Sequence, residues 1–493
     1  MTNTPILPGF HPDPSICRVG ERYYLVTSTF EYFPGVPIFT STDLVAWEQI
    51  GNVLDRPSQL RTTPGRAGAS SGIYAPTLRH HDGRFWLATT DFGTVSQGHL
   101  IVHAEDPSGP WSVPVHTTGA IGIDPDLTWD NAGVCYLTWS DVIRGGISQV
   151  PIDPRTGALL GDPKEIWRGT GGAHAEGPHI IRRGQWWYLL AAEGGTSIGH
   201  MVTVARSRSV DGPFESAPTN PILTHRSTSS PVQSTGHADV VERADGSWAL
   251  VHLGTRIRGS FPRWHTNGRE TFLAGLEWVD DWPVVREGAF TVPEVARRFE
   301  DNFTAPALDA RWIAPGAVPA EFALPGVDGL VLKAGRPPQE SGAQRLLAVR
   351  ATDLSWTARA EAEGDLALVV RIDDAHQVMV ERIGQLIRAR AVIGPLDQVL
   401  AERTPVAAAT SLVLTSAPAA GQRGERTGPD RLLLGYVEGQ EFVELAQIDG
   451  RYLSTEVAGG FTGRVIGLEA LGGDARVTRF VYEGSVPVPL PSI

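Results

Sequence analysis

Apolar and aromatic residues recur in the first 298 residues as short runs that follow a glycine-containing turn. Alternating segments such as Tyr23-Tyr24-Leu25-Val26-Thr27, separated by Gly, Asp and Pro, are typical of strands with one buried face and predict all-β structure with little helix. The five runs are Gly20-Glu21-Arg22-Tyr23-Tyr24-Leu25, Gly83-Arg84-Phe85-Trp86-Leu87, Gly133-Val134-Cys135-Tyr136-Leu137, Gly184-Gln185-Trp186-Trp187-Tyr188-Leu189 and Gly246-Ser247-Trp248-Ala249-Leu250.

A second short motif precedes each of these runs, which begin within about a dozen residues of it. Its copies are Asp13-Pro14-Ser15-Ile16, Ala75-Pro76-Thr77-Leu78, Asp124-Pro125-Asp126-Leu127, Glu176-Gly177-Pro178-His179-Ile180 and His237-Ala238-Asp239-Val240. Five copies in 298 residues leave about 60 residues for each, which suits a four-stranded unit that stacks on its neighbours to bury its apolar face. The pattern predicts a five-bladed β-propeller over residues 1–298.

The repeat stops near residue 298, and the composition shifts toward Ala, Val, Leu and Arg. Alternating apolar runs continue to the end of the chain, separated by turns such as Glu363-Gly364-Asp365 and Glu438-Gly439-Gln440. This spacing predicts a second domain, a jelly-roll-like β-sandwich over residues 299–493. The stretch 415–430, rich in Ala, Gly, Pro and Arg, is expected to be a loop within it.

Composition narrows the class of partner. The chain has 493 residues, of which 41% are hydrophobic and 20% charged, and its net charge of -13 disfavours nucleic acid, which binds to clusters of Lys and Arg. No stretch approaches the roughly 18 apolar residues of a membrane span, and the first residues do not resemble a secretion signal, so a cytoplasmic location is expected. Cys17 and Cys135 lie in apolar runs and are expected to be buried thiols.

Three carboxylates stand at or beside the same position of the repeated motif: Asp13, Asp124 and Glu176. Because equivalent positions of propeller blades surround one axis, these side chains are expected to converge. Two or three carboxyl groups around a pocket suit glycoside hydrolysis, in which one protonates the leaving oxygen and a second activates water or attacks the sugar. A third would raise the pKa of the acid by repulsion between like charges. The alternative is that these are turn residues, as Asp beside Pro often is.

Five ordered motifs resemble glycoside hydrolase family 43, in particular its β-xylosidase and α-L-arabinofuranosidase branch with a C-terminal β-sandwich. They are Pro8-Gly9-Phe10-His11-Pro12-Asp13-Pro14-Ser15, Ser71-Gly72-Ile73-Tyr74-Ala75-Pro76, Gly122-Ile123-Asp124-Pro125, Ala175-Glu176-Gly177-Pro178-His179 and Gly268-Arg269-Glu270-Thr271-Phe272-Leu273. Segments 299–303, 308–312 and 460–463 resemble the sandwich of the same branch.

The resemblance implies an inverting, exo-acting enzyme that removes terminal β-D-xylose, α-L-arabinofuranose or both from short oligosaccharides. Asp13 is then the general base, Glu176 the general acid, and Asp124 the group that tunes and orients Glu176. Arg269 would bind substrate hydroxyls. Aromatic walls of the sugar pocket would come from Phe30, Tyr74 and Trp264. Tyr74 stands where relatives usually have Trp or Phe, which leaves the sugar preference open.

His237 resembles a histidine of the propeller channel near which some relatives bind calcium or a cluster of water. His237 is therefore the candidate metal contact, although one imidazole is a poor ligand set for a hard cation and such an ion would be mostly water-coordinated. Its motif, His237-Ala238-Asp239, departs from relatives that often have Gly in the middle. No cofactor is otherwise expected to be required, and a homo-oligomer is left open.

Substrates would be xylo- or arabino-oligosaccharides, and a loop of the sandwich is expected to help close the pocket. A retaining fructosidase also places two Asp and one Glu on five blades, but its Trp-x-Asn-Asp-Pro-Asn, Arg-Asp-Pro and Glu-Cys motifs are replaced here by His11-Pro12-Asp13-Pro14, Ile123-Asp124-Pro125 and Glu176-Gly177. The other alternative is a non-catalytic carbohydrate-binding propeller, in which the aromatic residues would bind sugar and the acids would be incidental.

Overall fold

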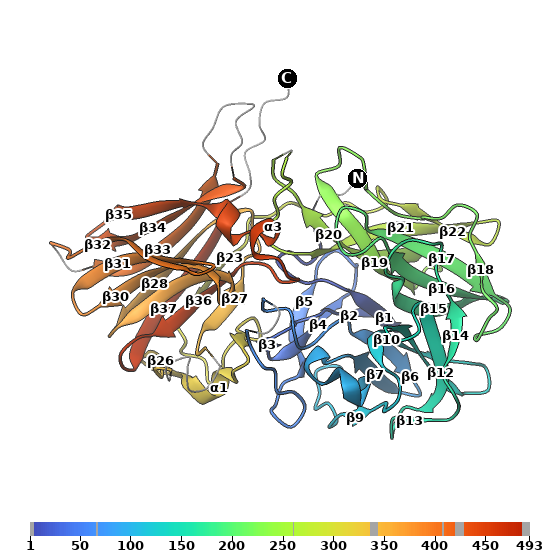
Figure 1. Ribbon diagram of the computed structural model, residues 1–493. Helices are drawn as coiled ribbons and strands as arrows, with labels where there is room; N and C mark the ends of the chain where they lie inside the picture. Colours follow the sequence, from blue (N-terminus) through green and yellow to red (C-terminus); the bar gives the residue numbers. More distant parts are fainter. Residues whose placement is uncertain are drawn as a thin grey trace.

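The computed structural model describes residues 4–65, 68–259, 261–335, 344–406, 409–419 and 428–485. Two β-rich domains lie side by side, the first coloured blue to green and the second yellow to red (Figure 1). Within these ranges the helices are short: η1 (Phe92–Gln97), α1 (Pro319–Phe322), η2 (Gly450–Leu453) and α3 (Thr455–Ala458). Within the described ranges no helix has the length and apolar character to cross a membrane.

The N-terminal domain is the predicted five-bladed propeller, with each blade an antiparallel sheet whose strands follow one another in chain order. In the third blade both β13 and β14 pair with β12. The strands of the five blades are β1 (Ser15–Val19), β2 (Arg22–Val26), β4 (Gly35–Ser41) and β5 (Glu48–Leu54); β6 (Thr77–His81), β7 (Arg84–Thr89), β8 (Leu100–Ala104) and β9 (Val115–His116); β10 (Gly122–Trp129), β11 (Cys135–Asp141), β12 (Ile147–Asp153), β13 (Ala158–Leu159) and β14 (Lys164–Trp167); β15 (Glu176–Arg183), β16 (Trp186–Glu193), β17 (Met201–Ser207) and β18 (Glu215–Ser216); and β19 (Val232–Glu242), β20 (Trp248–Arg256), β21 (Glu270–Val279) and β22 (Trp282–Arg286).

The repeated aromatic runs form the second strand of every blade and bury their apolar side chains between blades. One leucine of each run is fully buried: Leu25, Leu87, Leu137, Leu189 and Leu250. Separate apolar clusters join blades one and two, two and three, three and four, and four and five, and another joins blade five back to blade one. The ring is therefore closed by the same side chains that define the repeat.

The C-terminal domain is the predicted β-sandwich. One sheet has the order β25-β26-β37-β28-β33-β34-β35, with β23 also paired to β37, and the other has the order β27-β36-β29-β30-β31-β32. An apolar core with members from both sheets fills the space between them. The strands are β23 (Arg298–Asp301), β25 (Ala323–Gly326), β26 (Gly329–Leu332), β27 (Leu347–Arg350), β28 (Ser355–Glu363), β29 (Leu366–Asp373), β30 (His376–Ile383), β31 (Leu386–Ile393), β32 (Leu396–Arg403), β33 (Ala409–Pro418), β34 (Asp430–Glu438), β35 (Glu441–Asp449), β36 (Val465–Ala470) and β37 (Ala475–Ser485).

The expected loop over residues 415–430 is only partly correct. Strand β33 continues to Pro418 because it pairs with β34 as far as Asp430. Residues 420–427 of this stretch lie outside the described residues.

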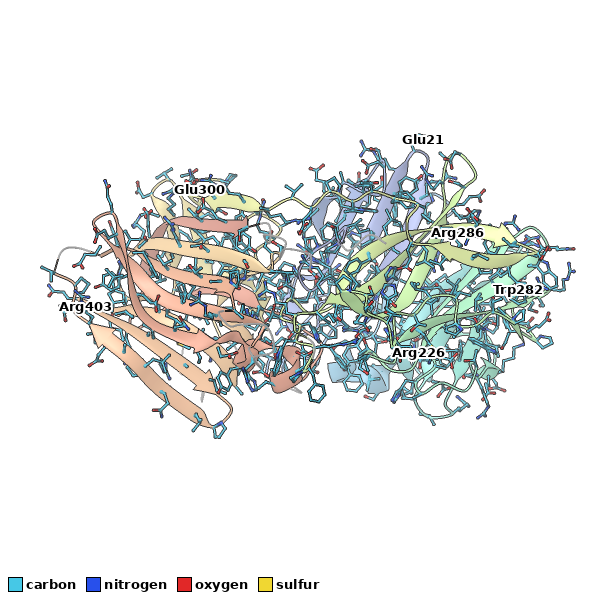
Figure 2. All side chains as sticks on the ribbon, turned by 90° about the horizontal axis from the view of Figure 1, so that it is seen from above. Glu21, Arg226, Trp282, Arg286, Glu300 and Arg403 are labelled. Carbon is cyan, nitrogen blue, oxygen red and sulfur yellow. The ribbon has the colours of Figure 1, made fainter. Side chains whose placement is uncertain are left out.

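The two domains are joined by strand pairing and by a buried ion pair. β3 (Tyr32–Phe33) of the propeller pairs with β24 (Ala314–Pro315), which lies between strands β23 and β25 of the sandwich in the chain. Glu31 contacts the Arg371 guanidinium at 2.9 Å, and both side chains are fully buried. From above, Arg403 and Trp282 lie at opposite outer ends of the molecule, with the contact between domains in the middle (Figure 2). The sandwich is thereby held against one side of the propeller.

Candidate active site

The repeated motif places one residue of each copy, here called the slot residue, within the innermost strand of its blade or two residues before it. The slot residues are Asp13, Ala75, Asp124, Gly177 and His237. Four of them have left-handed backbone: Asp13, Asp124, Gly177 and His237, with φ of 56°, 57°, 58° and 45°. This conformation costs a non-glycine residue free energy and persists where the surrounding fold enforces it, often at active sites.

Glycine at the slot of blade four explains why its carboxylate comes one residue earlier. A Cβ atom at Gly177 would lie 3.0 Å from the His237 ring, so a side chain does not fit there. The ladder between β15 and β16 changes register between Glu176 and His179, and that between β10 and β11 does so between Ile123 and Asp126. Such bulges redirect side chains, here at the places where Glu176 and Asp124 leave their strands.

Seven of the eight site residues predicted from the sequence line one pocket at this end of the propeller axis, and Trp264 is the exception. The complete lining is Asp13, Phe30, Tyr74, Ala75, Ile123, Asp124, Glu176, Thr196, His237, Arg269 and Phe461. The structure thus brings together residues from all five blades and one from the sandwich.

Asp13 is held as a carboxylate. Arg269 Nη1 donates to Asp13 Oδ1 at 3.0 Å, and the Ser28 hydroxyl donates to Asp13 Oδ2. Burial would raise the pKa of Asp13, but Arg269, His237 and Ser28 outweigh it, so that the pKa lies below its ordinary value. Asp13 is therefore ionised at neutral pH.

The pKa values of Asp124 and Glu176 are shifted in the opposite direction from that of Asp13. Burial, followed by repulsion from Glu176 and Asp13, raises the pKa of Asp124 well above its ordinary value. Burial and repulsion from Asp13 raise the pKa of Glu176 to about 7. The Gly177 N–H donates to Asp124 Oδ2 at 3.0 Å, which ties Asp124 to the backbone beside Glu176. This pair retains a proton near neutral pH, next to an ionised Asp13.

Aromatic side chains enclose the pocket. Phe30 contacts Tyr74 edge to face with ring centroids 5.6 Å apart, and Tyr74 stacks on Phe92 at 4.8 Å. Burial and the nearby Asp124 raise the pKa of Tyr74 to about 12, so its hydroxyl remains protonated. The Arg269 guanidinium lies 5.6 Å from the centre of the Phe30 ring. The site therefore combines apolar walls with a few polar groups at one end, as sugar pockets do.

The sandwich supplies one wall through Phe461, which agrees with the expectation that a loop of this domain closes the pocket. Its ring lies 5.8 Å from Phe30 and 6.1 Å from Tyr74, and the Arg269 guanidinium lies 5.2 Å from its centre. The Phe461 N–H donates to Ser70 Oγ at 2.8 Å, which fixes the loop on the propeller.

Two residues of the pocket carry no sequence signal strong enough to single them out, and one expectation is wrong. Thr196 Oγ1 accepts a hydrogen bond from Arg269 Nη1 at 3.1 Å, but a threonine in a loop has no distinctive pattern. Phe461 lies in segment 460–463, which resembles the sandwich of the family branch, but that motif does not indicate a contact with Arg269, which lies 192 residues earlier. Trp264 does not line the pocket, because its ring packs against the sandwich with the Arg451 guanidinium 5.6 Å from its centre.

His237 lines the pocket, but its surroundings do not fit a calcium ion. Its Nδ1 lies 3.5 Å from Asp13 Oδ1, the same oxygen that receives the Arg269 hydrogen bond. Burial lowers the pKa of His237 to about 4, so the ring is neutral. No group of three or more His, Cys, Asp or Glu side chains suited to a metal is found among the described residues. The carboxylates deeper in the channel, Asp126 and Asp239, are already paired with a guanidinium.

Chemically, the site offers a base and an acid in one enclosed pocket. Asp13 can accept a proton, and the Asp124–Glu176 pair can donate one. Groups whose environments push their pKa values apart in this way are suited to general acid–base catalysis.

Comparison with known proteins covers both domains. The model of glycosyl hydrolases family 43 matches residues 2–283, and that of the beta xylosidase C-terminal concanavalin A-like domain matches residues 300–482. The non-reducing end alpha-L-arabinofuranosidase BoGH43B of Bacteroides ovatus is 35% identical over 95% of this chain and 91% of its own length. A xylosidase/arabinosidase of Butyrivibrio fibrisolvens is 44% identical over 58% of this chain, and the match spans 57% of that relative.

Solved structures show the same two-domain arrangement. The Bacteroides ovatus xyloglucan PUL GH43B superposes with a TM-score of 0.85 at 32% identity, covering 98% of this chain and 99% of the other. The xylan beta-1,4-xylosidase from Bacillus halodurans superposes with a TM-score of 0.84 at 29% identity, covering 98% of this chain and all of the other.

Proposed function

The chain belongs to glycosyl hydrolases family 43, and from this membership we propose that it is an inverting exo-glycosidase acting on terminal β-D-xylose, α-L-arabinofuranose or both. Relatives named for each of these activities support the choice of sugars. The observation that carries the mechanism is the contrast in ionisation between Asp13 and the Asp124–Glu176 pair within one pocket.

In the proposed reaction, a water molecule attacks the anomeric carbon while the bond from that carbon to the leaving oxygen breaks. Asp13 takes a proton from the water, and Glu176 gives its proton to the leaving oxygen. Asp124 does not exchange a proton with substrate in this scheme. It accepts a hydrogen bond from the peptide N–H next to Glu176, and it lies close enough to Glu176 for the two carboxyl groups to repel each other when both are ionised.

Arg269 acts in this scheme on both substrate and base. It donates to Asp13 and Thr196 and lies beside Phe30 and Phe461, so that a sugar hydroxyl in the pocket would meet a fixed guanidinium. The loop bearing Phe461 covers the pocket from the sandwich side, which favours binding of a chain end over binding along a chain. Short xylo- or arabino-oligosaccharides are the proposed substrates.

The decisive experiment follows the first-formed anomer by proton NMR during hydrolysis of an aryl β-D-xyloside and an aryl α-L-arabinofuranoside. Inversion yields α-xylose from the first and β-arabinose from the second, before mutarotation. Retained configuration would overturn the inverting assignment and favour a covalent intermediate of the fructosidase type. Absence of hydrolysis on both substrates, together with measurable pentoside binding, would favour the carbohydrate-binding propeller.

A further inference from the structure

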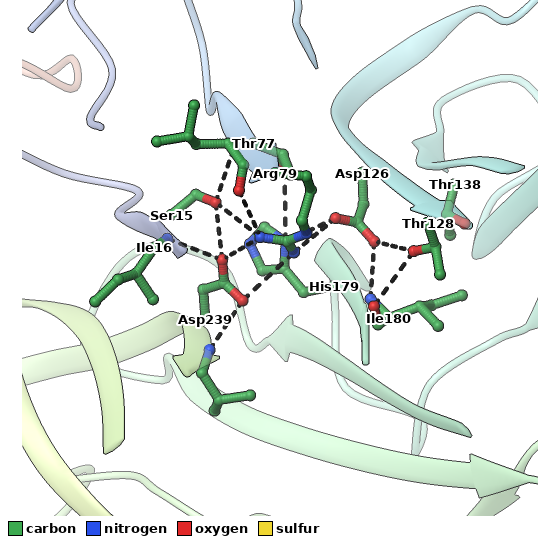
Figure 3. Close-up of polar contacts among 12 residues, drawn as sticks. Ser15, Ile16, Thr77, Arg79, Asp126, Thr128, Thr138, His179, Ile180 and Asp239 are labelled. Atoms are coloured by element: carbon green, nitrogen blue, oxygen red, sulfur yellow. Dashed lines mark hydrogen bonds and ion pairs between the residues drawn. The ribbon is translucent and has the colours of Figure 1, made fainter. Parts of the chain in front are cut away.

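A single guanidinium occupies the propeller axis beneath the pocket. Arg79 of β6 donates from Nη1 to Asp239 Oδ2 at 2.7 Å and from Nη2 to Asp126 Oδ1 at 2.7 Å (Figure 3). It also donates to Ser15 Oγ at 3.2 Å and to His179 Nδ1 at 3.0 Å. Its side chain is only 15% exposed, so these contacts form in a largely water-free place.

The residues around Arg79 are related to one another by the repeat. Each lies two positions after a slot residue, and their side chains gather around Arg79 (Figure 3). This second ring, which we call the axial ring, consists of Ser15, Thr77, Asp126, His179 and Asp239, one from each blade. The axial ring lies directly below the ring that holds the catalytic carboxylates.

The two axial carboxylates have their hydrogen-bonding capacity filled by the protein. Asp239 accepts from Ser15 Oγ, the Ile16 N–H and the Val240 N–H as well as from Arg79. Burial would raise the pKa of Asp239, but Arg79, His179 and the Ile16 N–H together outweigh it and bring this pKa to about 2. The two carboxylates thus share one guanidinium, and each oxygen of Asp239 and Asp126 already accepts at least one hydrogen bond from the protein.

Asp126 is held in the same way. It accepts from the Ile180 N–H at 2.8 Å and from Thr128 Oγ1 at 2.9 Å, in addition to Arg79. Both carboxylates are therefore fixed by backbone and side chain before any ligand is considered.

A line of rings connects Arg79 to the catalytic layer. Since a guanidinium only donates, its 3.0 Å contact makes His179 Nδ1 an acceptor and places the His179 proton on Nε2. The His179 ring centre lies 6.1 Å from that of His237, and His237 Nδ1 lies 3.5 Å from Asp13 Oδ1. A substitution of Arg79 can therefore affect the general base Asp13 through His179 and His237.

The axis also opens at the end remote from the catalytic pocket. A cavity of about 380 Å³ there is lined by residues of all five innermost strands, and Arg79 is one of them. An ion from solvent could reach the axial ring from this side if the guanidinium were removed.

We infer that Arg79 is a built-in cation that takes the place of a metal ion in the propeller axis, so that the axial ring is a divalent-cation site filled by a side chain. Asp126 and Asp239, with the hydroxyl of Ser15, are the hard oxygen donors that calcium prefers. Arg79 neutralises them and orients His179, and is thereby a positioning residue for His237 and Asp13. It does not touch the substrate.

The first test uses the wild-type protein and needs no glycosidase activity. We expect no calcium binding by isothermal titration calorimetry and the same melting temperature in EDTA and in millimolar calcium. Binding of one calcium per chain, or a melting temperature that falls on chelation, would overturn the inference.

The second test compares Arg79→Ala with Arg79→Met. Without added metal, both should melt about 10 °C lower than wild type, because removing one partner leaves two buried carboxylates unpaired. Calcium should restore the melting temperature of Arg79→Ala, and terbium should bind to it with sensitised luminescence. Arg79→Met fills the space with an apolar chain and should show neither effect.

Activity gives an independent readout of positioning. Metal-free Arg79→Ala should lose about 10- to 100-fold in kcat, the usual cost of losing a group that orients a reactive one, and calcium should recover part of it. Arg84→Ala, which breaks a partly exposed pair with Glu105 in the same hairpin, is the control and should behave as wild type. A folded Arg79→Ala that binds no calcium or terbium, or that retains full activity without metal, contradicts the inference.

Arg79→Lys covers the case in which Arg79→Ala does not fold even with calcium present. A lysine keeps the charge but cannot reach both carboxylates and His179 together. We expect a soluble variant with lowered kcat and an acidic limb of its pH profile displaced from that of wild type. A lysine variant identical to wild type in both would count against a positioning role.

Discussion

The propeller axis has an upper layer, formed by the slot residues and Glu176, and a lower layer, formed by the axial ring two residues further along the chain. The carboxylates of the two layers differ in how completely their charge is balanced by neighbouring groups. In the lower layer, Asp126 and Asp239 share the Arg79 guanidinium, and each accepts further hydrogen bonds from the protein. In the upper layer, three carboxylates face one guanidinium, that of Arg269, and Asp13 is the one of the three that it contacts. The upper layer therefore retains unbalanced groups whose protons can move, whereas the lower layer does not. The comparison suggests that chemistry on this repeat depends on incomplete charge compensation rather than on the presence of acids.

The largest expected effect is loss of the proton donor in the upper layer. Glu176→Gln keeps the shape but cannot protonate the leaving oxygen, so kcat/KM should fall by about 10³- to 10⁴-fold on substrates with poor leaving groups. The loss should shrink as the leaving group of an aryl pentoside becomes more acidic, because such a group departs without help. Kinetics on a series of substituted aryl pentosides measure this.

The exposed Glu215→Gln, elsewhere in blade four, is the matched control and should leave the rates unchanged. A Glu176→Gln loss that is equal for all leaving groups would show that Glu176 is not the acid. Wild-type activity in that variant would remove Glu176 from the mechanism.

Replacing a carboxylate by an amide in the lower layer should mainly lower the stability of the fold. Asp239→Asn removes one charge partner of the buried Arg79, and the free energy of unfolding should fall by about 3 kcal/mol. Urea denaturation of the variant and of Asp245→Asn, a surface control in the turn after β19, measures the difference. Full stability in Asp239→Asn would mean that the lower layer is not held together by this charge pair.

The sequence was sufficient for the architecture because the propeller signals are local and repeated. The buried leucine after each glycine turn and the motif before it mark every blade, so Asp13, Asp124 and Glu176 could be placed on one axis. The roles of Asp126 and Asp239 could not be found this way, although both lie within the motif copies. Both carboxylates act by pairing with Arg79, and in the sequence Arg79 is only one polar residue in the strand Thr77–His81.

Contacts between the two domains could not be predicted from the sequence either. The expectation that a sandwich loop closes the pocket had no residue attached to it, because Phe461 meets Phe30 across more than 400 residues of chain. Trp264 was assigned to the pocket wall from the family resemblance, whereas its ring packs against Arg451 of the sandwich. The position of a side chain at a domain interface depends on the surfaces of both domains. A sequence motif from one domain carries information about only one of these surfaces.

A smaller effect is expected from substituting Phe461, the pocket residue that the sandwich supplies. Phe461→Ala removes an apolar wall from the pocket, and kcat/KM should fall about tenfold, mainly through a higher KM, since burial of part of a ring is worth about 1.5 kcal/mol. Steady-state kinetics on an aryl β-D-xyloside measure the change.

Phe442→Ala, a partly exposed phenylalanine on β35 away from the pocket, is the control for general damage to the sandwich. Equal kinetics for Phe461→Ala and wild type would contradict a role of the second domain in binding.

The smallest expected effect concerns the ionisation of the upper layer and is read from pH profiles. Activity requires Asp13 without its proton and Glu176 with its proton. The pKa of Glu176, raised to about 7, sets a basic limb on which kcat/KM declines as the pH rises through that value. The lowered pKa of Asp13 sets an acidic limb below its ordinary value of 3.8.

Ser28→Ala should separate these two limbs. The Ser28 hydroxyl donates to Asp13 and stabilises the ionised form, so its loss should raise the pKa of Asp13 and move the acidic limb up by about one pH unit. The basic limb should stay in place, because at that pH Asp13 is ionised in both proteins and repels Glu176 equally. Thr27→Val is a close control, since Thr27 is the adjacent buried residue and its hydroxyl has no hydrogen-bond partner within the described part of the chain. An unmoved acidic limb in Ser28→Ala would mean that Asp13 is not the group that must lose its proton, and a shift of the basic limb alone would transfer the role of base to the Asp124–Glu176 pair.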